Sequence, residues 1–173
     1  MQSHIFGSIA EARRIHSNKP DLPEDYYLQI EQNTDNVLQS LPDSDIWPPL
    51  TRNFFAVASS DDGMITYDNR YIHFAASFNT IDWEFRDWLD KFEHLLSKLH
   101  WESAYVQLQG AHIGRYEFTW WPTKEWKEKF VKGILEPTAE WIFSSSQESN
   151  GLDKLSSLDA DDLNSFREHP APK

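Results

Sequence analysis

Residues 81 to 99 constrain the fold of this chain more than any other stretch. Their apolar side chains recur at steps of three and four, and at 100° per residue they fall within one sector of about 120°. This pattern predicts an amphipathic helix, with Asn79 or Thr80 as its N-cap. A helix with a single apolar stripe has to bury that stripe against another layer. The stripe consists of Ile81, Phe85, Trp88, Leu89, Phe92, Leu95, Leu96 and Leu99.

Alternating apolar and polar residues on both sides of this helix predict the layer against which it packs. Strands are expected at 53–59 and 64–78, joined by a hairpin turn at 60–63, and again around 104–108 and 113–121. The order of elements then gives two hairpins flanking a long helix. We therefore predict an α+β fold, with an antiparallel sheet of four or more strands and helices packed against it.

The remaining segments complete one expected domain, residues 1–143. Asp21 and Glu24 have the spacing of a capping box, and Pro42 ends the helix they begin. A short helix with lysines on its outer side is expected around Trp126 and Phe130. The pattern at 4–16 fits a strand or a helix equally well. From Ser144 the serine-rich composition predicts a polar linker and a weakly structured tail, residues 144–173.

Aromatic residues and the absence of cysteine bound the class of protein. The chain has 8 Trp, 11 Phe and 6 Tyr, so rings are expected to form most of the core. Zero cysteines exclude a disulfide framework and a thiolate zinc site, which favours a reducing compartment such as the cytoplasm. No run approaches the roughly 20 apolar residues of a membrane-spanning helix, and no partner in a membrane is expected.

Charge indicates what kind of partner the chain is suited to bind. The net charge of −12 disfavours nucleic acid, because polyanion binding requires Lys and Arg to neutralise phosphates. Residues 21–62 hold nine acids against one base, Arg52, so this quarter of the chain carries −8 of that charge. A charged partner should therefore be basic. The simpler interpretation is that the acids serve solubility.

A search for catalytic and metal-binding patterns finds little. The seven histidines show no metal-ligand spacing, no Gly-x-Ser-x-Gly or phosphate-binding glycine motif occurs, and we expect neither metal nor cofactor. Glu84 with Asp87, or Glu117, suggests acid–base chemistry of the glycosidase type in a groove lined by tryptophan. The structural alternative is a solvated helix face for the first two and a cross-strand salt bridge with Arg115 or a lysine for Glu117.

Two tryptophan positions bear on binding. Helical geometry places Trp83 on the outer face of the 81–99 helix together with Asp87, Asp90 and His94. Either the N-terminal 50 residues cover its ring, with Trp47 alongside, which we favour slightly, or a partner protein does. At Trp120-Trp121 one ring must leave the face that holds Tyr116 and Phe118. Helices over both sheet faces are the expected explanation, and a ligand or protein groove is the other.

Outward-facing strand residues form one further candidate. By alternation, the side chains of Tyr71, His73, Tyr105 and Gln107 all point away from the buried face of their strands. If these strands lie near one another, the residues form a polar and aromatic patch. Such a patch is either a binding site or the solvated face of the sheet.

The centre of the chain resembles a known class of proteins. Tyr71-Ile72-His73-Phe74, Trp88-Leu89-x-Lys91-Phe92-Glu93 and Trp101-x-x-Ala104, in a small acidic chain without cysteine, resemble immunity proteins encoded beside bacterial polymorphic toxins. The resemblance is one of type and covers about 50–122. It implies a protein without catalysis that occludes the active site of a cognate toxin, often a basic nuclease. No functional residue carries over from it.

These observations lead to one hypothesis with two alternatives. We expect a protein-binding inhibitor of the immunity type that neutralises a basic toxin, with acids steering the association. The alternatives are an enzyme acting on a small molecule or carbohydrate in an aromatic groove, and an adaptor subunit of a larger assembly. The residues expected to bind the partner are Asp43, Asp45, Asp61, Asp62, Trp83, Asp87, Asp90 and His94.

Overall fold

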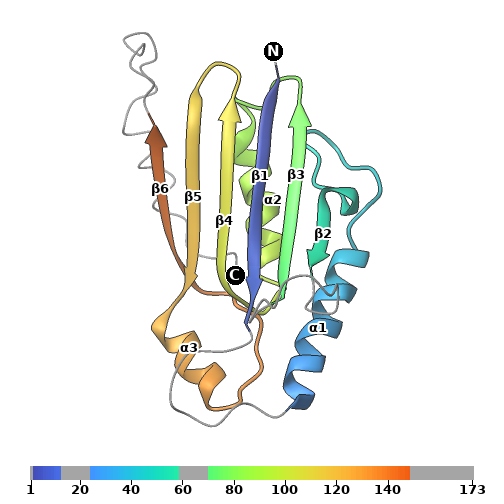
Figure 1. Ribbon diagram of the computed structural model, residues 1–173, viewed down its shortest axis with the longest axis vertical. Helices are drawn as coiled ribbons and strands as arrows, with labels where there is room; N and C mark the ends of the chain where they lie inside the picture. The colour runs from blue at the N-terminus through green and yellow to red at the C-terminus, as the bar shows by residue number, and fades with distance from the viewer. Residues whose placement is uncertain (1, 13–23, 59–69, 149–173) are drawn as a thin grey trace.

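The fold is a single antiparallel sheet with helices packed against it, as the sequence predicts. The computed structural model describes residues 2–12, 24–58 and 70–148 of the 173. Its sheet has six strands and, with the helices packed against it, confirms the α+β class (Figure 1). The strands are β1 (Ser3–Glu11), β2 (Phe55–Ala58), β3 (Tyr71–Phe78), β4 (Trp101–Gly110), β5 (Gly114–Pro122) and β6 (Trp141–Glu148). The helices are α1 (Glu24–Gln39), a short 3₁₀ helix (Arg52–Phe54), α2 (Phe85–Leu96) and α3 (Lys124–Val131).

The N-terminal segment, for which the sequence left strand and helix open, is a strand at the middle of the sheet. The strand order is β2-β3-β1-β4-β5-β6, so β1 lies between the two predicted hairpins and pairs with a strand of each. Ile5 stands opposite Ala76 on one side and Leu108 on the other. Ile5 and Ile9 are buried, which gives β1 the period of two that a strand requires.

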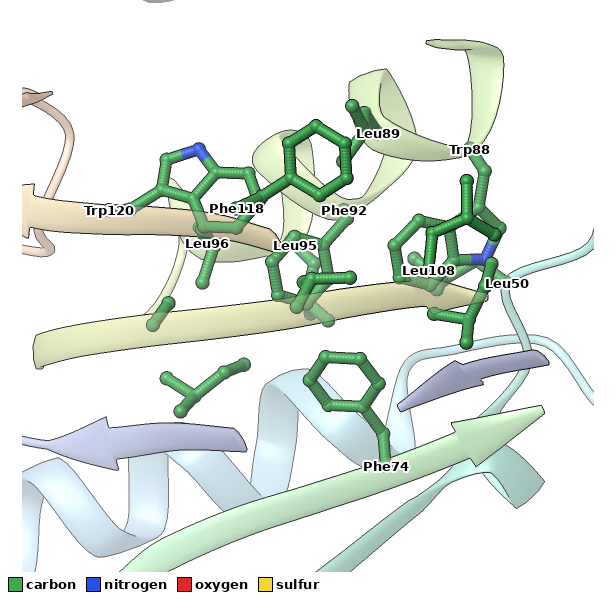
Figure 2. Close-up of a cluster of buried hydrophobic side chains, with 14 of the residues drawn as sticks. Leu50, Phe74, Trp88, Leu89, Phe92, Leu95, Leu96, Leu108, Phe118 and Trp120 are labelled. Atoms are coloured by element: carbon green, nitrogen blue, oxygen red, sulfur yellow. The ribbon is translucent and has the colours of Figure 1, made fainter. Parts of the chain in front are cut away.

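Helix α2 covers one face of the sheet and closes a core built from rings. Figure 2 shows Trp88 and Phe92 of α2 directed towards Phe74 of β3 and towards Phe118 and Trp120 of β5. The Phe92 ring lies 5.1 Å from Phe74 and 5.3 Å from Trp120, measured between ring centroids. Aromatic pairs at such separations add about 0.5–1.5 kcal/mol each beyond their buried area. The apolar stripe predicted for this helix is therefore the centre of the core.

Helices α1 and α3 lie at one end of the sheet (Figure 1). A smaller cluster joins Ile30 of α1, Trp126 and Phe130 of α3, and Ala12 just after β1. Thr123 is the N-cap of α3, because its side chain accepts a hydrogen bond from the backbone N–H of Trp126. The residue that follows β1 therefore packs against both helices.

Two predicted boundaries differ from the structure. Helix α2 begins at Phe85 rather than Ile81, and Glu84 occupies the N-cap position in place of Asn79 or Thr80. The cause is Asp82, whose carboxylate accepts the backbone N–H groups of Ala111 and His112 at 3.2 and 2.8 Å and so holds 82–84 in a turn. Ser144–Glu148, expected as the start of a linker, belongs to β6. Asp21 of the predicted capping box and the predicted turn at 60–63 lie outside the described residues.

The other sheet face is not covered by any described helix, contrary to the expectation that helices cover both faces (Figure 1). Trp121 shows the consequence, since its side chain lies on this face and is 48% exposed, whereas Trp120 is fully buried. An antiparallel sheet tolerates one solvated face, because its strands need no crossover helices to connect them. We call this surface the open face.

Candidate functional site

The predicted contact residue Trp83 is exposed, although it does not belong to a helix. It lies in the turn before α2, and 67% of its surface is accessible. The intramolecular cover favoured from the sequence is therefore wrong for the described residues. Asp87, Asp90 and His94 are exposed on α2, as predicted. These side chains lie on the helix surface that faces away from the sheet.

The segment before β2 is fixed to α2 by one lysine. The Nζ of Lys91 donates hydrogen bonds to the carboxylate of Asp45 at 2.7 Å and to the carbonyls of Ile46 and Pro48 at 2.9 Å each. Asp45 also accepts the backbone N–H groups of Ile46 and Leu50. The hydrogen bond from Lys91 is the main reason that the pKa of Asp45 is lowered. This network holds the 45–50 segment in one conformation against the helix.

The anchored segment presents two large apolar side chains to solvent. Ile46 is 78% exposed and Trp47 is 51% exposed. The Trp47 ring makes an edge contact with Phe78, the last residue of β3, at a centroid distance of 5.7 Å. Trp47 thus contacts the residue at which the β3–α2 connection begins, and Trp83 lies within that connection. We call Ile46, Trp47, Trp83, Asp87 and Asp90 the tryptophan surface.

The predicted acidic surface is partly neutralised within the chain. Asp35 pairs with Arg70, Asp43 with Arg52, and Asp45 with Lys91. The Asp45 pair is largely shielded from solvent, which makes Asp45 a structural residue rather than a free contact. Asp61 and Asp62 lie outside the described residues. Of the eight predicted contact residues, the structure thus places Asp43, Trp83, Asp87, Asp90 and His94 on an accessible surface, with Asp43 paired to Arg52.

The outward strand residues come together across β1 on the open face. Ser8 stands opposite His73 on β3 and Tyr105 on β4, and Phe6 stands opposite Gln107. The rings of Tyr71 and His73 are stacked at 6.0 Å, and the Tyr105 hydroxyl donates to the Gln107 carbonyl at 3.1 Å. The predicted polar and aromatic patch is confirmed as a set of neighbours on this face.

The acidic residues considered for catalysis do not converge. Glu117 lies on the open face, where Arg115 donates to its carboxylate at 2.6 Å; the partner is one of those expected, but the pair lies within β5 rather than across two strands. Glu84 immediately precedes α2, on the covered side. The sheet therefore separates Glu117 from Glu84 and from Asp87, which is exposed in the first turn of α2.

A buried polar cluster joins α1 to the end of β1. Arg70 donates to the carboxylate of Glu11 at 3.4 Å and to that of Asp35 at 2.5 Å. Burial raises the pKa of Glu11 despite the nearby guanidinium. Burial also lowers the pKa of His100, whose Nδ1 lies 3.2 Å from the Asn33 amide. Each member bonds to another element of the fold, so the cluster fastens α1 to the sheet.

Comparisons with known proteins do not identify the chain. No protein-family model, no curated protein and no solved structure matches it. Across residues 2–12, 24–58 and 70–148, no group of three His, Asp or Glu side chains could hold a metal ion. In the same part of the chain, no helix has the length and apolar character needed to span a membrane. The function therefore has to be argued from the surfaces.

Proposed function

We propose that this chain is a protein-binding inhibitor of the immunity type, which recognises a basic partner through the tryptophan surface. The observation that carries the proposal is the exposure of Ile46, Trp47 and Trp83 beside the β3–α2 connection. Large apolar side chains grouped on a surface indicate an interaction site, whereas isolated ones do not. Each tryptophan offers roughly 150–250 Å² for burial by a partner.

Preorganisation supports the same proposal. Binding costs free energy when loops and side chains have to be ordered in the complex, at about 0.5–1.5 kcal/mol per immobilised side chain. Here Lys91 already holds Ile46 and Pro48 through their backbone carbonyls, and Trp47 rests on Phe78. Part of the ordering cost is therefore met before the partner arrives. Rigid aromatic anchors are also the side chains most enriched among binding hot spots.

Charge supports a basic partner. Asp87 and Asp90 are exposed on α2 beside the apolar residues, and the chain as a whole carries −12. Carboxylates at the rim of an apolar contact mainly raise the association rate and exclude acidic competitors. An inhibitor of a basic toxin requires this arrangement: apolar anchors for affinity and acids for steering.

The test is calorimetric titration of the chain against the product of the gene encoded next to it. We expect binding at one-to-one stoichiometry. Trp83→Ala should weaken the complex by about 30-fold or more, since loss of a hot-spot residue costs about 2 kcal/mol or more. Trp121→Ala is the matched control, because this tryptophan is also exposed but lies on the open face. Equal loss for both variants, or no binding by the wild-type chain, would contradict the proposal.

Two further measurements separate the parts of the proposal. Asp87→Asn with Asp90→Asn should slow association at low salt and change dissociation little. Lys91→Met releases the 45–48 segment while leaving Trp83 and Asp87 in place, so it should weaken binding by less than Trp83→Ala does. Unchanged association rates in the double variant would remove the electrostatic part and leave the aromatic contact standing.

A further inference from the structure

The two edges of the sheet are built differently. At one edge, β2 pairs with β3 over only four residues and is preceded by a 3₁₀ helix. At the other edge, β6 pairs with β5 over eight residues, and Figure 1 shows it as the outermost strand. The backbone N–H and C=O groups on the outer side of an edge strand are unpaired and form a template for another strand. A short edge limits that risk, whereas β6 offers a long one.

Over its first seven residues β6 lacks the usual protections of an edge strand, and Glu148 at its end is its one charged residue. Proteins guard such strands with lysine, proline, bulges or charged side chains that oppose pairing. From Trp141 to Gln147 the sequence is Trp-Ile-Phe-Ser-Ser-Ser-Gln, without a charge or a proline. Ile142 is 62% exposed, and Trp141 and Phe143 lie half-buried where the ring core reaches the edge. Within the part of the chain that the structure describes, the edge of the core therefore ends on a strand that largely lacks these protections.

We propose that β6 pairs antiparallel with β6 of a second copy of this chain, joining the two six-stranded sheets into one. Antiparallel pairing of identical edges places a two-fold axis perpendicular to the sheet, and both copies then present α2 on the same side. Ile142, Ser144 and Ser146 lie on the open face, opposite Trp121, Thr119 and Glu117. Open-face residues of one copy must therefore stand opposite open-face residues of the other.

The side chains select the position of the axis. An axis at Phe143 places this ring opposite its own copy and extends a set of contacts in which Phe143 already lies 5.2 Å from Trp120 and 6.1 Å from Phe118. It also places Ile142 opposite Ser144. An axis at Ser144 places Phe143 opposite Ser145 and brings no apolar pair together. Directly opposed aromatic residues contribute more than serine pairs do, so the Phe143 axis is favoured.

Charge decides between a second copy and a basic partner as the occupant of this edge. Residues 141–147 of β6 are uncharged. Pairing with a second copy therefore places no like charges opposite one another in this segment, and a strand from a basic partner would form no ion pair there. The rest of each copy contributes to a net charge of −12, which repels the other copy at long range. Added salt screens this repulsion. Dimerisation should therefore strengthen as salt increases, the reverse of binding to a basic protein.

Sedimentation velocity on the full chain tests the proposal, from low micromolar to several hundred micromolar and at two salt concentrations. We expect a monomer–dimer equilibrium that shifts to dimer with concentration and with salt. Ser144→Lys adds an exposed charge to the edge and should weaken the dimer by about tenfold or more. Ala56→Lys, an exposed open-face position on the opposite edge strand, is the matched control and should leave the dimer unchanged. A monomer under all conditions, weakening by salt, or equal effects of the two variants would overturn the proposal.

The natural absence of cysteine allows a direct test of the register. Opposed residues of an antiparallel pair lie about 4.5–5.5 Å apart between Cα atoms, a distance that suits a disulfide. A mixture of Ile142→Cys and Ser144→Cys chains should therefore form a cross-linked dimer under oxidation. Cross-linking of Ser144→Cys alone with no reaction in the mixture would place the axis at Ser144 and overturn the Phe143 register.

Discussion

The two faces of the sheet use the same six strands for opposite purposes. On the covered face, α2 and the strands exclude water with stacked and tilted rings such as Trp88, Phe92 and Phe118. On the open face, hydroxyl, amide and imidazole groups stand among a few aromatic rings. Successive residues of every strand alternate between these environments. Along one strand, therefore, every second side chain stabilises the core, and the side chains between them face the solvent.

Trp120 and Trp121 make the comparison sharp, because they are chemically identical neighbours. Trp120 is fully buried, and its Nε1–H donates to the Glu93 carboxylate of α2 at 2.8 Å. Trp121 is 48% exposed and stands opposite Ile142 of β6. The first ring holds helix and sheet together. The second covers part of an edge strand.

The largest expected effect comes from removing each ring in turn. Trp120→Ala should lower the free energy of unfolding by about 3–5 kcal/mol, since it leaves a cavity under α2 and removes the hydrogen bond from the indole to Glu93. Trp121→Ala should cost about 1 kcal/mol or less, as is usual for a partly exposed side chain. Denaturant unfolding of both variants measures the difference. Should Trp120→Ala fail to fold, Trp120→Phe preserves the comparison with a smaller loss, and equal costs at the two positions would refute it.

A smaller effect is expected at the centre of the sheet, where Gly7 and Ser8 are adjacent on β1. A Cβ atom on Gly7 would press into the Phe74 ring and the Tyr105 carbonyl, so the glycine is required by close approach. Gly7→Ala should therefore cost about 1–3 kcal/mol through overpacking. Ser8 lies on the open face, and Ser8→Ala should change stability by no more than about 0.5 kcal/mol. Thermal or denaturant unfolding that shows the two variants to be equally stable would mean that Phe74 moves aside freely.

Local periodicity predicted the elements that this comparison depends on. The 3.6-residue repeat predicted the buried face of α2, and the two-residue alternation placed Phe74, Phe118 and Trp120 on the covered side. It failed to decide β1, because Gly7 interrupts the apolar alternation where a ring from β3 supplies the missing bulk. Periodicity also failed to predict β6, because its run of serines has the composition of a linker. The neighbouring strand β5, rather than the local sequence, makes this segment a strand.

The tryptophan surface was only partly predictable from the sequence. The outward positions of Trp83 and of the acids of α2 followed from side-chain spacing. The cover favoured for Trp83 was wrong, and the turn held by Asp82 was not predicted. The position of Ile46 and Trp47 depends on Lys91, two of whose three hydrogen bonds go to backbone carbonyls. No side-chain pattern reveals a contact made to the backbone of a distant segment. The pairs of Asp43 with Arg52 and of Asp45 with Lys91 join side chains that are separated in the sequence, and local periodicity does not reveal them either.

The smallest expected effect tests whether the open face is uniformly solvated, and it concerns Tyr105. Partial burial raises the pKa of this phenol above its usual value, and the neighbouring Glu117 carboxylate raises it further. A raised pKa means that the folded protein keeps this proton when the unfolded chain has lost it. The contribution to stability is thus complete below about pH 10, the ordinary tyrosine pKa, and is lost as the pH rises through the folded value.

Titration of the tyrosine ring carbons by NMR measures the Tyr105 pKa directly, with Tyr105→Phe identifying the signal. Glu117→Gln should lower this pKa by removing one of its causes, while the part due to burial should persist. Tyr105→Phe should flatten the alkaline slope of stability that this residue produces. An ordinary pKa in the wild-type chain would show that water reaches the middle of the open face as freely as its edge. The open face would then be solvated throughout. A raised pKa would instead show that Tyr105 and Gln107 are partly shielded from water on this face.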